Sequence, residues 1–365
     1  MELLYNIGLT LLPGVGDKLG KALVEHCGSA EAVFKEKKRN LEKIPDIGRI
    51  TAEKIVSQDV LKRAEEELVF IEKHHIQTFF FKDSSYPRRL SHCPDSPLML
   101  YFKGNVNFNT EKVLSIVGTR KCTDYGRSII ADLLSDLKND QVLVISGLAY
   151  GIDTFAHQIA LENGLETVGV LGHGLDRIYP HQNRNLAKKM LDKGGILTDF
   201  LSNTNPDAVN FPSRNRIIAG LSDATIVVEA ARHGGALITA DIANSYNRDV
   251  FAVPGRLNDE RSEGCNFLIK TNKAALIESA QDIRYLLNWD VERQPKLVVQ
   301  PKLFLDLPED QRLVLDALQT NPEAVVDELC TLLKLPLSKL SAIFLQLEIA
   351  GIVEILPGKR WRLIF

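Results

Sequence analysis

The sequence lacks the features that would direct the protein to a membrane or to secretion. No apolar run approaches the roughly 20 residues that a membrane-spanning helix needs. The five cysteines are odd in number and far apart, and the first 12 residues contain no basic segment of the kind that begins a signal peptide. We therefore expect a cytoplasmic protein with free thiols, no disulfide framework and no membrane partner.

Patterns that bind metals or nucleotides are also missing. There is no C-x-x-C or H-E-x-x-H spacing, and GVGDKLGK departs from a P-loop because Ala22 follows the lysine, where a magnesium ligand would carry a hydroxyl. The turn GTRKCTDYG lacks the dinucleotide pattern G-x-G-x-x-G, and no acid for a ribose follows the strand that ends at Ser146. We expect no metal, no cofactor and no ATP hydrolysis.

The net charge is only −3, although proteins that bind nucleic acid usually have a basic surface. Residues 176–216 nonetheless hold seven basic side chains against four acidic ones. Positive charge is therefore concentrated in one segment of the chain.

From Lys112 on, the chain alternates regularly between strand, glycine and helix. Six short apolar runs carry the pattern: KVLSIVG, QVLVISG, TVGVLG, GILTDF, ATIVVEA and DVFAVPG. Such alternation predicts an α/β domain, here placed at residues 76–290, with right-handed crossovers and a doubly wound parallel sheet. Ligands of this fold bind beyond the carboxyl ends of the strands.

Glycines and cations gather at those strand ends, in the segments 118–120, 147–153, 172–174, 211–216 and 233–235. In the fourth of these segments, Arg214, Asn215 and Arg216 come just before a predicted helical turn. The first backbone N–H groups of a helix are unpaired and favour anions. Together the five segments predict a crevice that binds phosphate.

Asp153 and His157 lie four residues apart and therefore share one face of a predicted helix. Such a pair is able to act as a base and its orienting acid, but no nucleophile is specified beside it. We favour a structural interpretation, in which Asp153 serves the start of its helix and His157 is a packed side chain with a hydrogen-bond partner.

Residues 1–75 contain two copies of a hairpin pattern, LPGVG and IPDIG, each followed by a helix. The pattern resembles the tandem helix-hairpin-helix, whose turns expose backbone N–H groups that hold a phosphate without reading sequence. Asp46 stands in the second copy where glycine is expected, and residues 1–60 balance nine basic against nine acidic residues. DNA contact and protein interaction therefore both stay open for this domain. A charged helix over 61–75 and aromatic strands within 77–83 and 97–104 follow it.

The end of the chain is predicted to be a linker and a small domain. ERQPKLVVQPK contains prolines and no periodicity, which favours a linker over 291–304. Three helices, over 308–320, 323–333 and 337–350, and a hairpin then predict a winged helix over 305–365. Its third helix has an apolar face expected to pack against its own domain: Leu337, Leu340, Ile343, Phe344, Leu347 and Ile349. With six basic and nine acidic residues, this domain is not expected to recognise duplex DNA by itself.

Several motifs, in a fixed order, resemble the DprA/Smf family of bacterial DNA-processing proteins: IVGTR with YGR, SGLAYGIDTFAH, VLGHGLDRIYPHQN, FPSRNRIIAGLSDATIVVEA, ALITADIA, VFAVPG and GCNFLI. The resemblance covers about residues 80–290. It implies an extended Rossmann fold that binds single-stranded DNA and forms a homodimer through that domain. It also implies a role in natural transformation, in which the protein protects incoming DNA and loads the recombinase RecA.

Carried over residue by residue, the resemblance implies a DNA-binding pocket that includes Arg120, the loop from Gly147 through Gly151 to Asp153, Tyr179, Pro180, Asn183, Arg214, Asn215 and Arg216. We also predict DNA contacts by Gly118, Thr119, Lys188 and Phe211, the last as a ring on which a base is able to stack. The sequence departs from the family pattern at His173, at Gly234-Gly235-Ala236 and at Asn247, which bears on the details of the pocket.

Two other functions compete with DNA binding. Glycine-rich turns also occur in related Rossmann enzymes, the phosphoribohydrolases that resemble lysine decarboxylases. The acid that such an enzyme needs has only Glu229 as a candidate, without the expected spacing. Alternatively, the chain is an adaptor that acts through its two end domains. We favour a protein that binds DNA and is not an enzyme.

Overall fold

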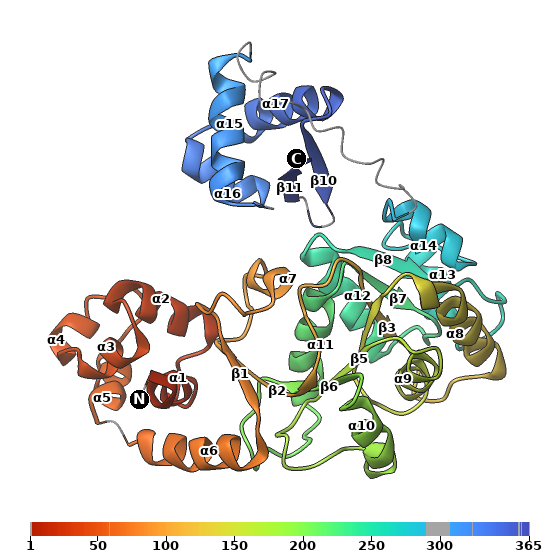
Figure 1. Ribbon diagram of the computed structural model, residues 1–365. Helices are drawn as coiled ribbons and strands as arrows, with labels where there is room; N and C mark the ends of the chain where they lie inside the picture. The colour runs from red at the N-terminus through yellow and green to blue at the C-terminus, as the bar shows by residue number, and fades with distance from the viewer. Residues whose placement is uncertain are drawn as a thin grey trace.

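The computed structural model describes residues 2–57, 59–289, 307–322, 324–356, 358 and 360–364. The predicted linker over 291–304 lies outside these residues. A large sheet with helices on both faces forms the body of the molecule, a helical domain precedes it, and a small domain of three helices and a hairpin follows it (Figure 1).

The sheet has nine strands in the order β1-β2-β6-β5-β4-β3-β7-β8-β9. Seven of them, β3 to β9, run parallel, and β1 and β2 are antiparallel at one edge. The strands are β1 (Gln77–Phe80), β2 (Met99–Asn105), β3 (Val113–Val117), β4 (Leu143–Ser146), β5 (Thr167–Val170), β6 (Gly194–Thr198), β7 (Ala224–Val227), β8 (Asp249–Ala252) and β9 (Ala275–Leu276). The predicted doubly wound fold is confirmed.

The direction in which strands are added reverses beside β3. The chain adds β4, β5 and β6 on one side of β3, then returns to place β7 and β8 on its other side. In open α/β sheets, ligands bind at such a reversal, where the loops that follow the two neighbouring strands diverge. The topology therefore places the candidate site at the carboxyl ends of β3 and β7.

Two layers of helices bury the sheet. One core lies beneath α8 (Asp124–Asp136), α9 (Ile152–Glu162) and α14 (Ala280–Leu286), and another lies beneath α11 (Asn210–Leu221), α12 (Gly235–Ser245) and α13 (Glu263–Lys270). The short α10 (Arg184–Met190) packs near β5 and β6. Because both faces are covered, all the residues of β3, β4, β5, β6 and β7 are buried, which explains their continuous apolar runs.

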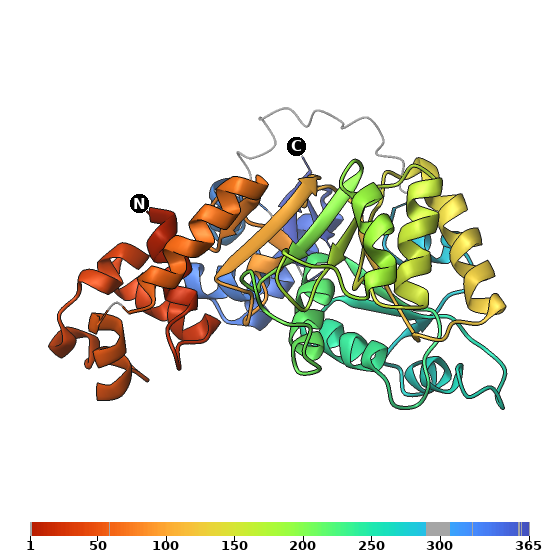
Figure 2. The ribbon, with the colours of Figure 1, turned by 90° about the horizontal axis from the view of Figure 1, so that it is seen from below.

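The N-terminal domain consists of α1 (Glu2–Thr10), α2 (Asp17–Cys27), α3 (Ala30–Lys35), α4 (Lys38–Leu41), α5 (Arg49–Ser57) and α6 (Leu61–His74). Its two hairpin turns have matching geometry: Gly14 has φ of 83° and Asp46, at the equivalent position, has φ of 64°. Aspartate is among the residues that tolerate the left-handed region, which explains how it replaces glycine there. The domain shares one core with Phe80 and Met99, and Figure 2 shows its helices beside the β1 edge of the sheet.

The C-terminal domain has the predicted order of elements, with α15 (Glu309–Thr320), α16 (Val326–Leu333), α17 (Leu337–Ile349), β10 (Val353–Leu356) and β11 (Arg360–Leu363). The middle of the predicted apolar face of α17 is buried, and Phe344 stacks on Trp361 with ring centroids 4.4 Å apart. The prediction was wrong at both ends of this helix, because Leu337 is 54% and Ile349 79% exposed. The helix extends beyond the small core that it covers.

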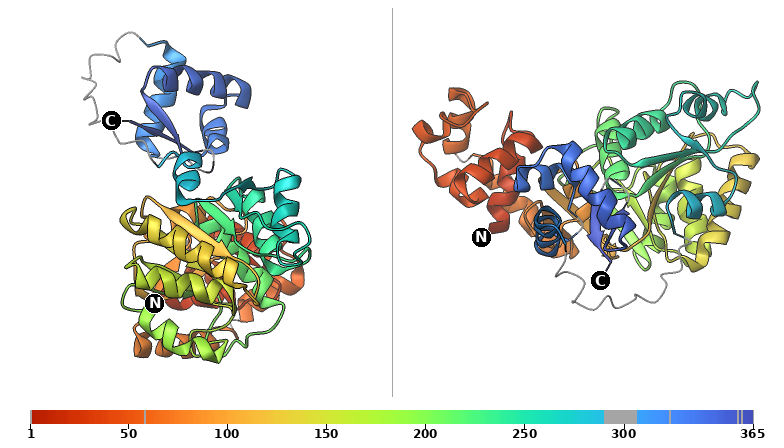
Figure 3. Two further views of the ribbon diagram at one scale, coloured as in Figure 1. Left: turned by 90° about the vertical axis from the view of Figure 1, so that its right-hand side faces the viewer. Right: turned by 90° about the horizontal axis from the view of Figure 1, so that it is seen from above.

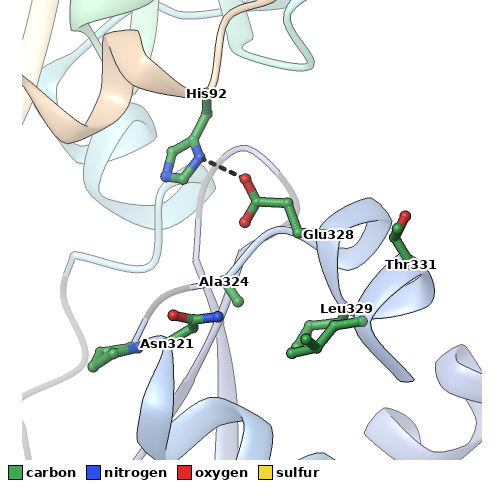
Figure 4. Close-up of a pocket in the computed structure, with 8 residues that line it drawn as sticks. His92, Asn321, Ala324, Glu328, Leu329 and Thr331 are labelled. Atoms are coloured by element: carbon green, nitrogen blue, oxygen red, sulfur yellow. Dashed lines mark ion pairs between the residues drawn. The ribbon is translucent and has the colours of Figure 1, made fainter. Parts of the chain in front are cut away.

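The C-terminal domain contacts the body at the amino ends of the strands, opposite the candidate site (Figures 1 and 3). Arg360 is buried, and its guanidinium lies 3.8 Å from the carboxylate of Asp223, the residue before β7. Beside this contact is a cleft of about 700 Å³ between α16 and the segment that follows α7 (Arg88–Ser91). Across the cleft, His92 Nδ1 lies 3.7 Å from Glu328 Oε1 (Figure 4). This pairing holds the pKa of the Glu328 carboxyl below its usual range.

Candidate functional site

A cavity of about 760 Å³ opens where the topology places the site, beyond the carboxyl ends of β3 and β7. Four of the five segments predicted to converge contribute to its wall: 118–120, 147–153, 211–216 and 233–235. The predicted site residues that line it are Gly118, Thr119, Arg120, Asp153, Tyr179, Phe211, Arg214 and Asn215. The fifth segment lies behind the wall, where Gly172 leaves room for the ring of Phe211.

The turn after β3 forms one wall of the cavity. Thr119 N donates to Glu229 O at 2.8 Å, and Thr119 O accepts from Ile152 N at 3.1 Å, so the start of the turn is held from two sides. Gly151 has φ of 76°, and a side chain there would collide with the backbone of Thr119 and Arg120. The glycine is therefore required both by its conformation and by this close approach. Lys121, the next residue of the turn, also lines the cavity. Of these two neighbouring cations, only Arg120 was predicted to do so.

Arg214 is a buried wall residue of this cavity. Helix α11 begins at Asn210, so the expectation that Arg214 precedes the helix was wrong. Its side chain is almost wholly buried, 4% of the residue being exposed, and its guanidinium donates to Val170 O. Gly147 packs directly against this guanidinium, where a Cβ atom would collide with it.

The charge of Arg214 is poorly compensated by the residues that the structure describes. Among the residues that the structure describes, no carboxylate lies within ion-pairing distance of its guanidinium, and its Nε has no hydrogen-bond partner. Burial lowers the pKa of Arg214 to about 10, while the more distant carboxylate of Asp153 acts in the opposite direction. The cavity is therefore bordered by a poorly compensated positive charge, which an anionic ligand would complement.

Arg216, two residues further along α11, points elsewhere. Its guanidinium pairs with Asp17 and Asp199 at 2.8 Å each and also donates to Asp95 O. These ion pairs raise the pKa of Arg216 against the effect of its burial. Asp17 begins α2, so the contact joins the N-terminal domain to the body. The structure does not bring Arg216 to the cavity, where it was expected.

Two aromatic side chains lie at the mouth of the cavity. Tyr179, which is 45% exposed, stacks on Phe211 with ring centroids 5.9 Å apart and planes at 30°. The Arg120 guanidinium lies 5.8 Å from the centroid of the Phe211 ring. The buried His173 explains one departure from the family pattern, because its Nε2 accepts from Tyr179 N at 3.3 Å and fixes the backbone beneath this ring.

Asp153 and His157 do not form a catalytic pair in this structure. Asp153 Oδ2 accepts from Gly147 N at 3.1 Å and from Ala149 N at 3.3 Å, and so holds the loop after β4. His157 is fully buried behind the cavity, with Nδ1 2.6 Å from the hydroxyl of Thr167. Burial raises the pKa of the Asp153 carboxyl and lowers that of the His157 imidazole to about 3. His157 has the expected hydrogen-bond partner, whereas Asp153 bonds to the loop before α9 and makes no capping hydrogen bond at the start of that helix.

The other predicted residues lie behind or away from the cavity wall. Gly147 and Gly151 make room for Arg214 and for the turn after β3, as described above. Asn183 donates to Leu148 O at 2.8 Å and to the Thr154 hydroxyl at 2.7 Å, so it supports the loop after β4. Lys188 is exposed on α10 and does not line the cavity.

Sequence reasoning left several lining residues out of the proposed site. Besides Lys121, these include Pro206, Ala208 and the segment His233-Gly234-Gly235. That segment was placed at a strand end but not chosen, although two consecutive glycines at the start of α12 indicate exposed backbone N–H groups there. Within the described part of the chain, no group of three or more His, Cys, Asp or Glu residues could hold a metal ion. No helix among those residues is long and apolar enough to cross a membrane.

Comparison with known proteins accounts for this architecture. A sequence model of the family described as DNA recombination-mediator protein A matches residues 77–288. The chain belongs to the DprA/Smf family. Models of a SAM-like helix-hairpin-helix tandem and of the DprA winged helix domain match residues 7–58 and 302–359. The family and the identity of both end domains, predicted from sequence, are thereby confirmed.

Individual DprA/Smf relatives are similar over long stretches. Protein Smf of Synechocystis is 33% identical over 396 residues, covering 99% of this chain and 98% of the relative. DNA processing protein DprA of Streptococcus pneumoniae is 41% identical over 206 residues, covering 56% of this chain and 72% of the relative.

Two solved DprA structures share the fold. That of the Streptococcus pneumoniae protein matches with a TM-score of 0.68 and 32% identity, over 77% of this chain and 97% of the other. That of Helicobacter pylori DprA, described as giving insight into its single-stranded DNA binding mode, matches with a TM-score of 0.54 and 29% identity, over 59% and 96%.

Proposed function

We propose that this chain binds single-stranded DNA in the cavity at the carboxyl ends of β3 and β7. The observation that carries the proposal is Arg214, a buried cation in the cavity wall with no carboxylate of the described residues within ion-pairing distance. A buried charge is costly unless it is compensated, so an anion that enters this cavity gains an interaction that the free protein lacks. The Helicobacter pylori relative, whose structure is described in terms of single-stranded DNA, supports DNA phosphate as this anion.

The rest of the cavity suits an unpaired strand. Arg120 and Lys121 border it and are able to contact neighbouring phosphates, while Tyr179 offers an exposed ring beside them. A base that is splayed out of a single strand can stack on such a ring for roughly 1–3 kcal/mol, whereas the bases of a duplex are already stacked within it. We expect oligothymidine to bind more tightly than duplex DNA of the same length.

Binding of fluorescent oligothymidine at increasing salt concentration tests the proposal. A plot of log affinity against log salt should fall with a slope of about −0.7 for each phosphate contact. Replacing both Arg120 and Arg214 should weaken binding and flatten the slope. Lys188→Ala is the matched control, because Lys188 is a cation of the same domain that does not line the cavity. If the double variant keeps the affinity and slope of the parent, the cavity is not the DNA site.

The family resemblance extends the proposal to partners. We propose that the chain forms a homodimer through the sheet domain, protects incoming DNA in natural transformation and loads RecA onto it. Light scattering at several protein concentrations measures the dimer, and a monomeric mass throughout would contradict it. Assembly of RecA on oligothymidine, with and without this protein, measures loading, and an unchanged rate and extent would contradict that role.

Against the hydrolase alternative stands the position of Glu229. Both of its carboxylate oxygens accept from Thr123, and it does not line the cavity. A carboxylate held in this way is not available to a substrate as a base. Incubation with nucleoside monophosphates should release no free base, and turnover that Glu229→Gln abolishes would overturn this conclusion.

A further inference from the structure

Glu229 holds both ends of the turn that carries the two cations of the cavity. Its backbone oxygen accepts from Thr119 N at 2.8 Å. Its side chain accepts from Thr123 N at 2.9 Å and from the Thr123 hydroxyl. Arg120 and Lys121 lie between these two anchored residues and line the cavity.

We propose that Glu229 is a positioning residue for DNA binding, which fixes the turn 119–123 so that Arg120 and Lys121 face the bound DNA strand. The inference rests on the proposed function of the cavity. The inference gives a role to a buried carboxylate that does not line the cavity. Without such a role, its negative charge would only oppose the binding of phosphate nearby.

The surroundings of Glu229 are built around its carboxylate. The residue is only 1% exposed, and Gly126 faces it so closely that a Cβ atom there would lie 2.5 Å from Glu229 Oε2. Thr123 is also the N-cap of α8, because its hydroxyl accepts from Gly126 N at 3.2 Å. The carboxylate therefore fixes the residue at which the turn ends and the helix begins, at the end of the helix that favours negative charge.

The same segment forms the adjoining part of the cavity wall. Ala230 and Ala231, which follow Glu229, line it, and Ala230 is held in turn by backbone hydrogen bonds to Arg261 and Gly264. Glu229 thus connects this part of the wall to the part that carries the cations. Loss of the Glu229 side chain frees Thr123 and lets the turn move away from the bound DNA strand. The hydrogen bond from Thr119 N to the backbone oxygen of residue 229 remains.

Glu229 should affect the affinity for DNA only by positioning Arg120 and Lys121. Glu229→Ala should weaken oligothymidine binding by about tenfold, the loss expected when a charge-assisted contact is misplaced. The same substitution made in an Arg120→Ala, Lys121→Ala background should cause little further loss, because no cations are left to position. Glu229→Gln should keep most of the affinity, since its amide is able to accept from Thr123 N and donate to the Thr123 hydroxyl.

Glu67 provides a matched control. It is another buried carboxylate, 2% exposed, that accepts from the backbone N–H and the hydroxyl of Ser202 and, unlike Glu229, also pairs with Arg63 at 2.7 Å. It lies where the N-terminal domain meets the body and does not line the cavity. Glu67→Ala should lower the unfolding midpoint as Glu229→Ala does, yet leave the affinity of the folded protein unchanged.

The full-length chain is used for all measurements, with oligothymidine as the probe. If Glu229→Ala does not fold, Thr123→Val replaces it, because it removes the hydroxyl that the carboxylate binds and should show the same dependence on the two cations. Unchanged affinity in the folded Glu229 or Thr123 variant overturns the inference, as does an equal loss with and without the cations. If replacing Arg120, Lys121 and Arg214 has no effect, the proposed function itself fails, which is a different result.

Discussion

Arg214 and Arg216 stand two residues apart on α11 and belong to two different regions of the molecule. Arg214 lies in the wall of the cavity, where it donates to a backbone oxygen and has no carboxylate close by within the described residues. Arg216 lies at the junction with the N-terminal domain, between Asp17 and Asp199. One helix therefore presents the same kind of side chain to the cavity on one face and to a contact between domains on another.

The two sites differ in how well nearby carboxylates neutralise the charge of the arginine. The charge of Arg216 is neutralised within the protein, so its replacement leaves two carboxylates without their cation. The charge of Arg214 is poorly compensated in the free protein. Its replacement therefore removes a buried charge that destabilises the fold, and it also removes an attraction for an anion. We therefore expect one arginine to control mainly stability and the other mainly affinity.

The largest effect is expected at the junction. Arg216→Ala should lower the free energy of unfolding by about 3–5 kcal/mol, the usual cost of removing one partner from a buried ion pair. Urea unfolding followed by circular dichroism measures this, and oligothymidine affinity of the folded variant should change by less than about threefold, roughly 0.7 kcal/mol. A large loss of affinity with unchanged stability would place Arg216 in the DNA site after all.

The reverse pattern is expected in the cavity. Arg214→Met should weaken oligothymidine binding by about a hundredfold, which corresponds to roughly 2.7 kcal/mol. Stability should stay the same or rise, because a buried charge is replaced by an apolar side chain of similar length. The same urea titration is the control, and strong destabilisation of this variant would show that Arg214 has a structural role like that of Arg216.

Substitutions of Tyr179, at the mouth of the cavity, distinguish base stacking from contacts with phosphate. Tyr179→Ala should reduce single-strand affinity by about 1–2 kcal/mol through the loss of one stacked base, without a change in salt slope. Tyr179→Phe keeps the ring and should bind as the parent does. Equal affinities of Tyr179→Ala and the parent for oligothymidine would mean that the cavity holds the strand by its phosphates alone.

The smallest effect is expected at the C-terminal domain, which contacts the amino ends of the strands through Arg360 and Asp223. Removing residues 296–365 should change single-strand affinity by less than about tenfold, or 1.4 kcal/mol. The truncated protein is first checked for folding and for unchanged oligomeric state. A hundredfold loss under those conditions would contradict the assignment of DNA binding to the cavity.

The sequence was sufficient to predict the architecture. The parallel strands are short runs rich in Val, Ile and Leu, because a parallel sheet covered on both faces favours apolar side chains. The hairpin turns of the N-terminal domain were also visible, since glycine and aspartate tolerate the positive φ found at Gly14 and Asp46. These features depend on local conformation and on burial, which nearby residues determine.

The direction of individual side chains was not visible in the sequence. In FPSRNRIIAGLS both arginines look alike, and only the start of α11 at Asn210 and its packing decide that Arg214 meets the cavity while Arg216 meets Asp17, 199 positions earlier in the chain. Glu229 and Thr123 come together across 106 residues for the same reason. Composition and periodicity describe neighbours along the chain, whereas the counter-ion of a buried charge is selected by contacts between segments that only the folded protein brings together.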